Sequence, residues 1–214
     1  MYILQSDLNF PPVEYADEEG LLCIGGDLSP QRLQKAYSSG IFPWYEIDGI
    51  IFWFSPNPRC ILYPDSIKVS KSMKQFMRKE KFSVSFNQQF KEVIDLCGQV
   101  IRKDQESTWI SPYFKMAYEH LFKIGMAQSV EVWNEKNELV GGLYGTDIGN
   151  GIFCGESMFS LESNASKFAL IKLAEKLAGE KYQFIDCQIM NPHLASLGAV
   201  DVDRSDFIKF LENC

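Results

Sequence analysis

The chain has 214 residues, of which 46% are hydrophobic and 14% aromatic, and its formal net charge is −7. This composition predicts a folded protein with one medium domain, or a small lobe and one ordinary domain, and excludes a disordered chain. No run approaches the roughly 20 apolar residues that span a bilayer, and the start, MYILQSDLNFPP, does not have the pattern of a signal peptide. We therefore expect a cytoplasmic protein without a membrane partner.

Residues 1–60 are rich in turn-forming residues and predict a small N-terminal lobe. Within it, Ser29 as N-cap and Pro30 at the first helical position predict a helix that stops before Gly40. The apolar run over residues 50–54 predicts a short buried strand, which the sequence SPNP then closes.

Residues 61–214 predict a second, larger domain of mixed composition. We expect helices near residues 70–80, 87–97, 111–124, 164–178 and 205–212, and strands near residues 82–86, 128–134, 138–147, 151–159 and 183–189. Three consecutive strands over residues 128–159 indicate an antiparallel meander, and the whole pattern predicts an α+β fold.

The segment of residues 65–81 carries six basic and two acidic residues, so it is locally +4 while the rest of the chain is at −11. Three of the basic residues share one face of the predicted helix. Such a run is usually a solvated helix face, but in an acidic protein it is also the surface best suited to phosphates. The candidate phosphate-binding residues are Lys68, Lys71, Lys74, Arg78, Lys79 and Lys81.

Six widely spaced cysteines without a C-x-x-C pair favour buried thiols over a disulfide framework. The two histidines, His120 and His193, offer no zinc-ligand spacing, so we expect no metal. Trp44 and Trp109 lie in turn-like contexts. Each is a core residue by default, and a stacking platform for a nucleobase if its indole is exposed.

Two strands carry acidic or amide residues among apolar neighbours. Glu156 lies between soft apolar residues, which indicates a paired carboxylate or a functional one, and Gly155 beside it would allow close approach to the backbone. In the strand over residues 183–189, alternation predicts that Asp186 and Gln188 share one face and can hydrogen-bond, while Cys187 points away. A solvated strand face and a Cys187 nucleophile are the alternatives; the orientation favours a buried, inert thiol.

Several segments, in order along nearly the whole chain, resemble those of a known family. They are GLL (residues 20–22), GGDLSP (25–30), GIFPW (40–44), WFSPNPR (53–59), TWI (108–110), SVEVW (129–133), VGGLYG (140–145), FCGESMFS (153–160), NASK (164–167), IDCQ (185–188) and HLASLGA (193–199). In these segments the chain resembles the bacterial leucyl/phenylalanyl-tRNA–protein transferase family.

The resemblance implies a small N-terminal lobe on a GNAT-like acyltransferase domain. It also implies transfer of Leu or Phe, and less well Met, from aminoacyl-tRNA to an N-terminal Arg or Lys of an acceptor protein, which marks that protein for degradation by the N-end rule. No cofactor is implied, because the aminoacyl ester is already activated. We expect a monomer.

By matched motif, Asp186 and Gln188 are the expected catalytic pair. Gln188 would accept a hydrogen bond from the attacking amine, and Asp186 would orient the Gln188 amide. The resemblance also implies that the basic residues from Lys68 to Lys81 bind the acceptor stem of the tRNA. The expected substrate-binding residues are Trp44, Trp109, Leu143, Phe153, Gly155, Glu156, Met158, Leu170 and Ile185.

Three other functions remain open at this point. One is a sibling transferase that modifies acidic N-termini. Another is an acetyl-CoA-dependent GNAT enzyme, disfavoured because SLESNASK (residues 160–167) has no glycine where such enzymes place a pyrophosphate loop. The third is a tRNA-binding module without catalytic activity.

Overall fold

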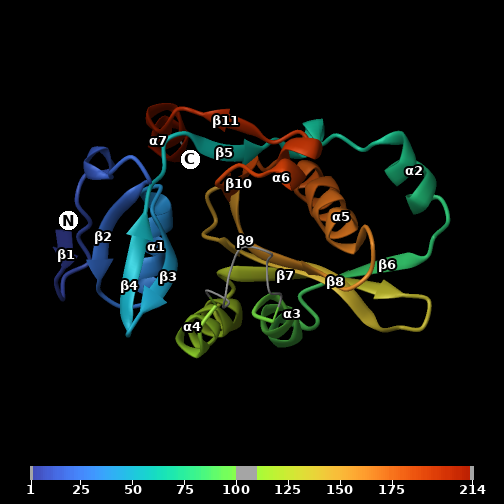
Figure 1. Ribbon diagram of the computed structural model, residues 1–214, viewed down its shortest axis with the longest axis horizontal. Helices are drawn as coiled ribbons and strands as arrows, with labels where there is room; N and C mark the ends of the chain where they lie inside the picture. Colours follow the sequence, from blue (N-terminus) through green and yellow to red (C-terminus); the bar gives the residue numbers. More distant parts are fainter. Residues whose placement is uncertain (1, 100–109, 213–214) are drawn as a thin grey trace.

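The computed structural model describes residues 2–99 and 110–212, which form two β-sheets flanked by helices (Figure 1). The smaller sheet has the strand order β1-β2-β4-β3, and the larger has the order β11-β5-β10-β9-β8-β7-β6. The strands are β1 (Tyr2–Leu4), β2 (Leu21–Gly25), β3 (Phe42–Ile47), β4 (Ile50–Phe54), β5 (Arg59–Leu62), β6 (Phe82–Phe86), β7 (Ala127–Asn134), β8 (Leu139–Asp147), β9 (Ile152–Ser160), β10 (Phe184–Gln188) and β11 (Val200–Val202).

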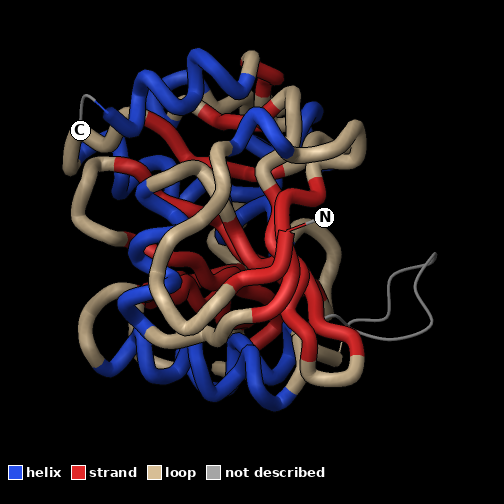
Figure 2. Tube along the Cα trace, turned by 90° about the vertical axis from the view of Figure 1, so that its left-hand side faces the viewer, coloured by secondary structure: helices blue, strands red, loops and turns tan. Residues whose placement is uncertain are grey.

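The described part of the chain also contains helices, most of which connect the strands. They are α1 (Pro30–Ser38), α2 (Lys71–Met77), α3 (Phe90–Cys97), α4 (Pro112–Lys123), α5 (Ala165–Gly179), α6 (Pro192–Ser196) and α7 (Arg204–Glu212), with the 3-10 turns η1 (Val13–Tyr15) and η2 (Pro64–Ser66). Figure 2 shows the strands as a band with helices above and below it. None of the described helices is long and apolar enough to cross a membrane.

The small sheet and α1 form the N-terminal lobe. As predicted, α1 begins at Pro30 after the N-cap Ser29 and ends before Gly40. Gly40 has a φ of +72°, and a Cβ there would lie 2.5 Å from Cδ1 of Ile208 on α7. The lobe and the C-terminal helix therefore meet where only glycine fits.

The large sheet is antiparallel except where β9 and β10 run parallel. One of its faces is covered by α3 and α4, and the other by α5, whose apolar side chains form a second buried cluster (Figure 1). The sheet pairs β10 with both β9 and β5. This pairing brings residues near 60, 155 and 187 together, and the candidate site lies there.

The α+β class, the small N-terminal sheet and the mostly antiparallel larger sheet are confirmed. Every helix and strand predicted beyond residue 65 is present, with ends shifted by up to about three residues. The strands β1, β2, β3, β5 and β11 were not predicted, because turn-forming residues dominate their surroundings. The small sheet ends at Phe54 and the large one begins at Arg59; the division into two domains at residue 60 stays a prediction.

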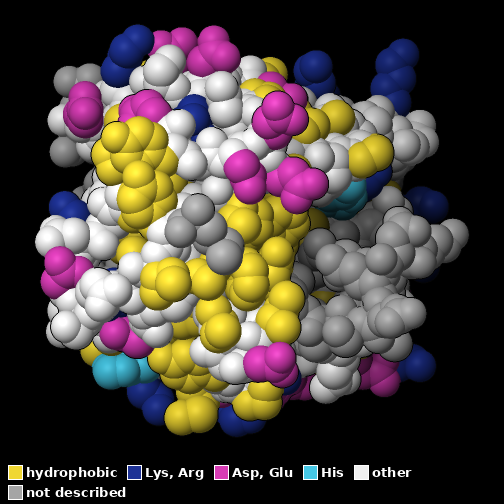
Figure 3. All heavy atoms as spheres, turned by 60° about the vertical axis from the view of Figure 1, so that its left-hand side comes forward, with side chains coloured by type: hydrophobic (Ala, Val, Ile, Leu, Met, Phe, Trp, Pro, Cys, Tyr) yellow, Lys and Arg dark blue, Asp and Glu magenta, His cyan; other side chains and the backbone are white. Residues whose placement is uncertain are grey.

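Exposed apolar side chains gather on the face of the small lobe (Figure 3). Tyr2 on β1 stacks on Tyr15 of η1, with ring centroids 5.5 Å apart. Ile47 and Ile50 lie at the β3–β4 hairpin and are 54% and 44% exposed. None of these four side chains is among the residues that line the cavity described below.

Candidate active site

A cavity of about 580 Å³ lies between the large sheet, α5, the segment around α6 and strand β3 of the small lobe. Its lining is largely apolar. The apolar residues predicted for an amino-acid side-chain pocket all line it: Leu143, Phe153, Met158, Leu170 and Ile185. A side chain the size of Leu or Phe fits within such a volume, and an apolar wall selects by size and shape.

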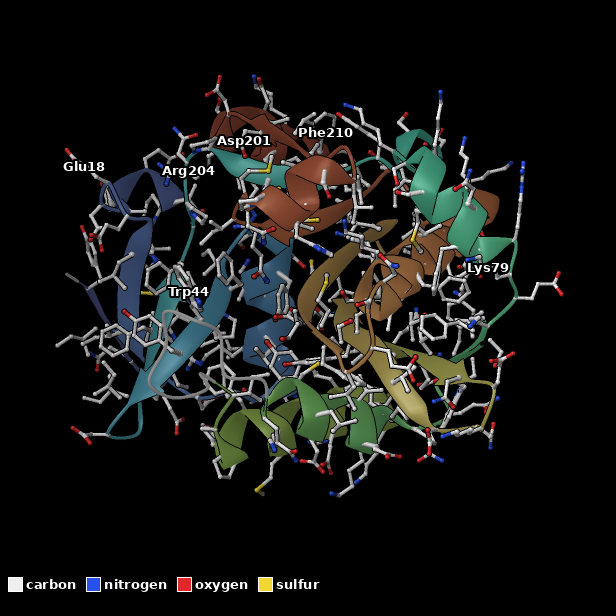
Figure 4. All side chains as sticks on the ribbon, turned by 45° about the vertical axis from the view of Figure 1, so that its right-hand side comes forward. Glu18, Trp44, Lys79, Asp201, Arg204 and Phe210 are labelled. Carbon is white, nitrogen blue, oxygen red and sulfur yellow. The ribbon has the colours of Figure 1, made fainter. Side chains whose placement is uncertain are left out.

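The polar wall of the cavity includes Gly155, Glu156 and Gln188. Trp44 lines the cavity from the small lobe, and its ring packs edge-on against Phe54, with centroids 4.8 Å apart (Figure 4). Trp44, Gly155 and Glu156 are therefore together, as predicted from the sequence. Trp109 lies outside the described residues, so its place at the site stays a prediction.

Glu156 is the extra residue of a β-bulge in β9: Tyr144 pairs with Ser157, and Gly145 pairs with Gly155. Bulges re-aim side chains, and this one turns Glu156 toward buried hydroxyl groups. Its Oε1 accepts hydrogen bonds from Tyr37 at 2.6 Å and from Thr146 at 3.1 Å. Its Oε2 accepts from Tyr118 at 3.2 Å and from Nε2 of Gln188 at 3.5 Å.

Burial raises the pKa of Glu156 to about 7, against the opposing effect of the hydroxyl hydrogen bonds. Glu156 makes no ion pair with any described residue. Of the two possibilities left open by the sequence, a salt bridge is therefore not the reason for its position. A carboxyl group with such a pKa can gain or lose a proton near neutral pH.

Asp186 is buried and forms a bidentate ion pair with Arg59 of β5, through Nε at 2.8 Å and Nη2 at 2.6 Å. The Arg59 guanidinium lies between the rings of Phe42 and Phe207, 4.7 Å from each centroid, and donates to the carbonyl of Gly40. The Asp186 carboxylate therefore faces the junction of the small lobe, β5 and α7. Asp186 is not among the residues that line the cavity.

Gln188 reaches the cavity because β10 is irregular at its end. Asp186 pairs with Ile61 and Gln188 pairs with Cys60, which leaves Cys187 as a bulge, and Gln188 has a φ of +66°. The Gln188 backbone N–H donates to Oδ1 of Asp186 at 3.0 Å. Asp186 thus holds the backbone of Gln188, whereas the sequence predicted that it would hold the side-chain amide.

The bulge makes the predicted alternation wrong at Gln188, which was expected to share the face of Asp186; Cys187 points away from Asp186, as predicted. Cys187 and Gln188 both line the cavity, and Asp186 lies on the other side of the sheet. A hydrogen bond with Cys60 and burial raise the pKa of the Cys187 thiol well above its ordinary value. The prediction of an inert thiol therefore rests on its protonation rather than on its orientation.

Replacing Cys187 by alanine should keep the catalytic rate within about threefold of the wild type, because the thiol only forms part of the wall. Loss of a covalent nucleophile would instead cost orders of magnitude. The rates of the wild type and of the Cys187→Ala variant are compared under single-turnover conditions. Inactivation by the alanine substitution would revive the nucleophile hypothesis.

The six predicted tRNA-binding residues are all exposed, on α2 and the segments beside it. None of them takes part in an ion pair with a described residue. Met73 anchors α2 to the core. Figure 4 shows Lys79 at the solvent-facing end of this segment, on the opposite side of the molecule from Trp44.

Four residues that shape the site were not predicted to do so: Arg59, Tyr37, Tyr118 and Thr146. Arg59 belongs to a segment, WFSPNPR, that was recognised only as part of the resemblance. Tyr37 and Tyr118 lie on different helices, 119 and 38 residues from Glu156 in the chain. Sequence periodicity assigns both tyrosines to helix faces but does not bring their hydroxyls together.

Comparison with known proteins assigns both parts of the chain to one family. The model of the leucyl/phenylalanyl-tRNA protein transferase family matches residues 61–212, and the model of its N-terminal domain matches residues 26–57. A solved structure of a conserved protein of unknown function from Bacteroides thetaiotaomicron aligns with a TM-score of 0.49 and 13% identity, over 81% of this chain and 62% of that one.

Curated relatives match over the full length. A leucyl/phenylalanyl-tRNA–protein transferase from Flavobacterium johnsoniae is 53% identical over 100% of both chains. One from Christiangramia forsetii is 51% identical over 99% of this chain and 100% of its own. The chain therefore belongs to the leucyl/phenylalanyl-tRNA–protein transferase family.

Proposed function

We propose that this protein transfers Leu or Phe, and less well Met, from aminoacyl-tRNA to the N-terminal Arg or Lys of acceptor proteins. The product is a peptide bond and an N-terminal degradation signal. The proposed enzyme acts in the cytoplasm as a monomer, without ATP, CoA or a metal, with a small lobe over residues 1–60 and a catalytic domain over residues 61–214. The observation that carries the proposal is an apolar cavity of about 580 Å³ with the Gln188 amide and the Glu156 carboxyl on its wall.

The reaction needs little acid–base catalysis. The α-amine of the acceptor attacks the ester carbonyl; the new C–N bond forms, the C–O bond to the ribose breaks, and the proton that the amine loses is balanced by the one that the departing ribose oxygen gains. An unperturbed α-amine has a pKa near 8, so roughly a tenth of it is neutral at pH 7. Correct positioning of the amine can therefore supply most of the acceleration.

Gln188 is the proposed positioning group. Its Nε2 points at Glu156, which leaves its carbonyl oxygen available to accept a hydrogen bond from the attacking amine and aim the lone pair. An amide cannot take a proton at neutral pH, so Gln188 is not a general base. Asp186 acts through the backbone of Gln188, whose left-handed conformation it stabilises by accepting the N–H.

The cavity predicts coarse selection of the amino acid. Apolar contacts discriminate by only about 1–3 kcal/mol per methylene, which is compatible with accepting both Leu and Phe. The proposed order, with Met below Leu and Phe, is tested by comparing single-turnover rates with the three charged tRNAs. Equal rates for Leu and a β-branched amino acid such as Ile would contradict a shape-selective pocket.

The basic residues beside and on α2 are the proposed contacts to the acceptor stem of the tRNA. Replacing Lys74 and Arg78 by glutamine should weaken tRNA binding and reduce the slope of log Kd against log salt by about 0.7–0.9 per lost phosphate contact. Lys136, exposed in the β7–β8 turn, provides the matched control. If Lys136→Gln changes the slope as much as the α2 variants do, the tRNA does not bind at this face.

The function is tested with purified protein, labelled Leu-tRNA and peptides that differ only in the first residue. We expect transfer to an Arg-starting peptide and little to an Asp-starting one, without ATP or CoA. Preference for the Asp-starting peptide would favour the sibling transferase. Binding of tRNA with no transfer to any peptide would leave a binding module, and a requirement for acetyl-CoA would indicate a GNAT acetyltransferase.

A further inference from the structure

Three buried oxygen-bearing groups meet behind the cavity wall. The hydroxyl oxygens of Tyr37 and Tyr118 are 2.6 Å apart. The Tyr37 hydroxyl is 2.6 Å from Oε1 of Glu156, and the Tyr118 hydroxyl is 3.2 Å from Oε2. Both tyrosines are at most 3% exposed. These three contacts close a ring between α1, α4 and β9.

A ring of three hydrogen bonds needs three protons. The two hydroxyl groups supply one each. If Glu156 is ionised, one pair of oxygens in the ring must face each other without a proton between them, and this costs free energy in a buried site. If Glu156 is a carboxylic acid, it donates to Tyr37, Tyr37 donates to Tyr118, and Tyr118 donates to the second oxygen of Glu156. The neutral acid alone satisfies the whole ring.

The groups around Glu156 act in both directions: each hydroxyl donor, taken singly, lowers the pKa of Glu156, but burial outweighs these donors and raises the pKa. Burial raises the pKa of Glu156, the Asp186 carboxylate on β10 raises it further, and Cys154 beside it on β9 is a protonated thiol. The nearby cation, Arg59 on β5, is already paired with Asp186. Thr146 on β8 and the amide of Gln188 donate to Glu156 in either protonation state.

Glu156 is the only carboxylate among the described residues that line the cavity. A ligand ammonium that enters this cavity therefore meets one acidic group, and that group is uncharged while the ring is closed. A positive charge beside a carboxyl group favours its ionised form. The positive charge of the ammonium can also offset the repulsion between the two ring oxygens that have no proton between them once Glu156 has ionised.

We propose that Tyr37 and Tyr118 are positioning residues that hold Glu156 as a neutral acid in the free protein, and that Glu156 releases this proton when the cavity binds a ligand α-ammonium. The inference rests on the proposed function, because both proposed substrates, the aminoacyl group and the acceptor N-terminus, carry such an ammonium. Binding is then coupled to the loss of one proton.

The first test measures the titration midpoint of Glu156 by NMR of carboxyl-labelled glutamate, with the signal assigned through Glu156→Gln. The Tyr118→Phe variant opens the ring, so the ionised form no longer forces two bare oxygens together. We expect its midpoint to lie below that of the wild type. If Tyr118 only donates to a carboxylate, its removal raises the midpoint instead, and a raised or unchanged midpoint would overturn the inference.

Tyr182→Phe is the matched control. Its hydroxyl also donates to a carboxylate, that of Asp147, and neither residue lines the cavity. Removal of the Tyr182 hydroxyl should leave the titration midpoint of Glu156 the same as in the wild type. A shift as large as that of Tyr118→Phe would mean that the effect is not specific to the ring, and the inference would fail.

The second test measures proton release by calorimetry at pH 6, in two buffers with different ionisation enthalpies. The probes are a non-hydrolysable leucyl-adenosine amide and an Arg-starting peptide. With a pKa of about 7, roughly nine-tenths of Glu156 is protonated at pH 6. We expect Glu156 to release close to one proton when the probe whose ammonium lies beside it binds, so the measurement identifies that probe. With the Glu156→Gln variant we expect no proton release.

Binding of both probes without proton release would overturn the inference even if transfer proceeds normally. Failure of the proposed function has a different signature: no transfer from Leu-tRNA, with the order of the NMR midpoints intact. The two results are therefore separable on the same protein.

Discussion

Replacing Arg59 by methionine is expected to lower the free energy of unfolding by about 3–5 kcal/mol, because it leaves the Asp186 carboxylate buried without a counter-ion. Both side chains are 1% exposed, and the pair is bidentate. The substitution also removes the cation from between Phe42 and Phe207. Denaturant unfolding of the variant and the wild type measures the loss.

Two further variants separate the charge effect from general disruption. Removal of both partners, in Arg59→Met with Asp186→Leu, should recover part of the lost stability, since it eliminates the unpaired charge. Lys209→Met breaks an exposed ion pair with Asp206 and should lower the free energy of unfolding much less than Arg59→Met does. If Arg59→Met costs no more than Lys209→Met does, the Arg59–Asp186 pair does not hold the site together.

Replacing Gln188 by alanine is expected to slow transfer on the order of 10²-fold while the affinity for aminoacyl-tRNA stays close to that of the wild type. The alanine variant loses the amide that aims the attacking amine, and misplacement of a reacting group by about 1 Å has effects of this size. The apolar wall that holds the amino-acid side chain is unchanged by the substitution. Gln183→Ala, just before the same strand, is the control and should transfer at the wild-type rate.

Periodicity and turn signals predicted most of the large sheet and its helices correctly. Strands β7, β8 and β9 are long and alternate or run apolar, and the turns between them contain residues with positive φ, such as Asn137 and Gly151. Strand β4 of the small lobe was predicted, but β1, β2 and β3 escaped prediction, because each is three to six residues long and is set among prolines and glycines. These strands are stabilised by pairing with other strands, which a short stretch of sequence does not reveal.

The cavity could be predicted in part. Its apolar wall follows from segments shared with the family, and all five of those residues line it. The separation of Gln188 from Asp186 could not be predicted, because alternation assumes a regular strand and β10 has a bulge at Cys187. The partner of Asp186, Arg59, is 127 residues away in the chain. Only the pairing of β5 with β10 brings the two together.

The most direct test of the account combines two measurements on Gln188→Ala: the single-turnover rate of Leu transfer to an Arg-starting peptide, and the Kd for Leu-tRNA. If Gln188 positions the attacking amine, the rate falls on the order of 10²-fold while the Kd changes by less than about threefold. Equal losses in rate and affinity, or a rate that does not change, would contradict the assignment of Gln188 to the transfer step.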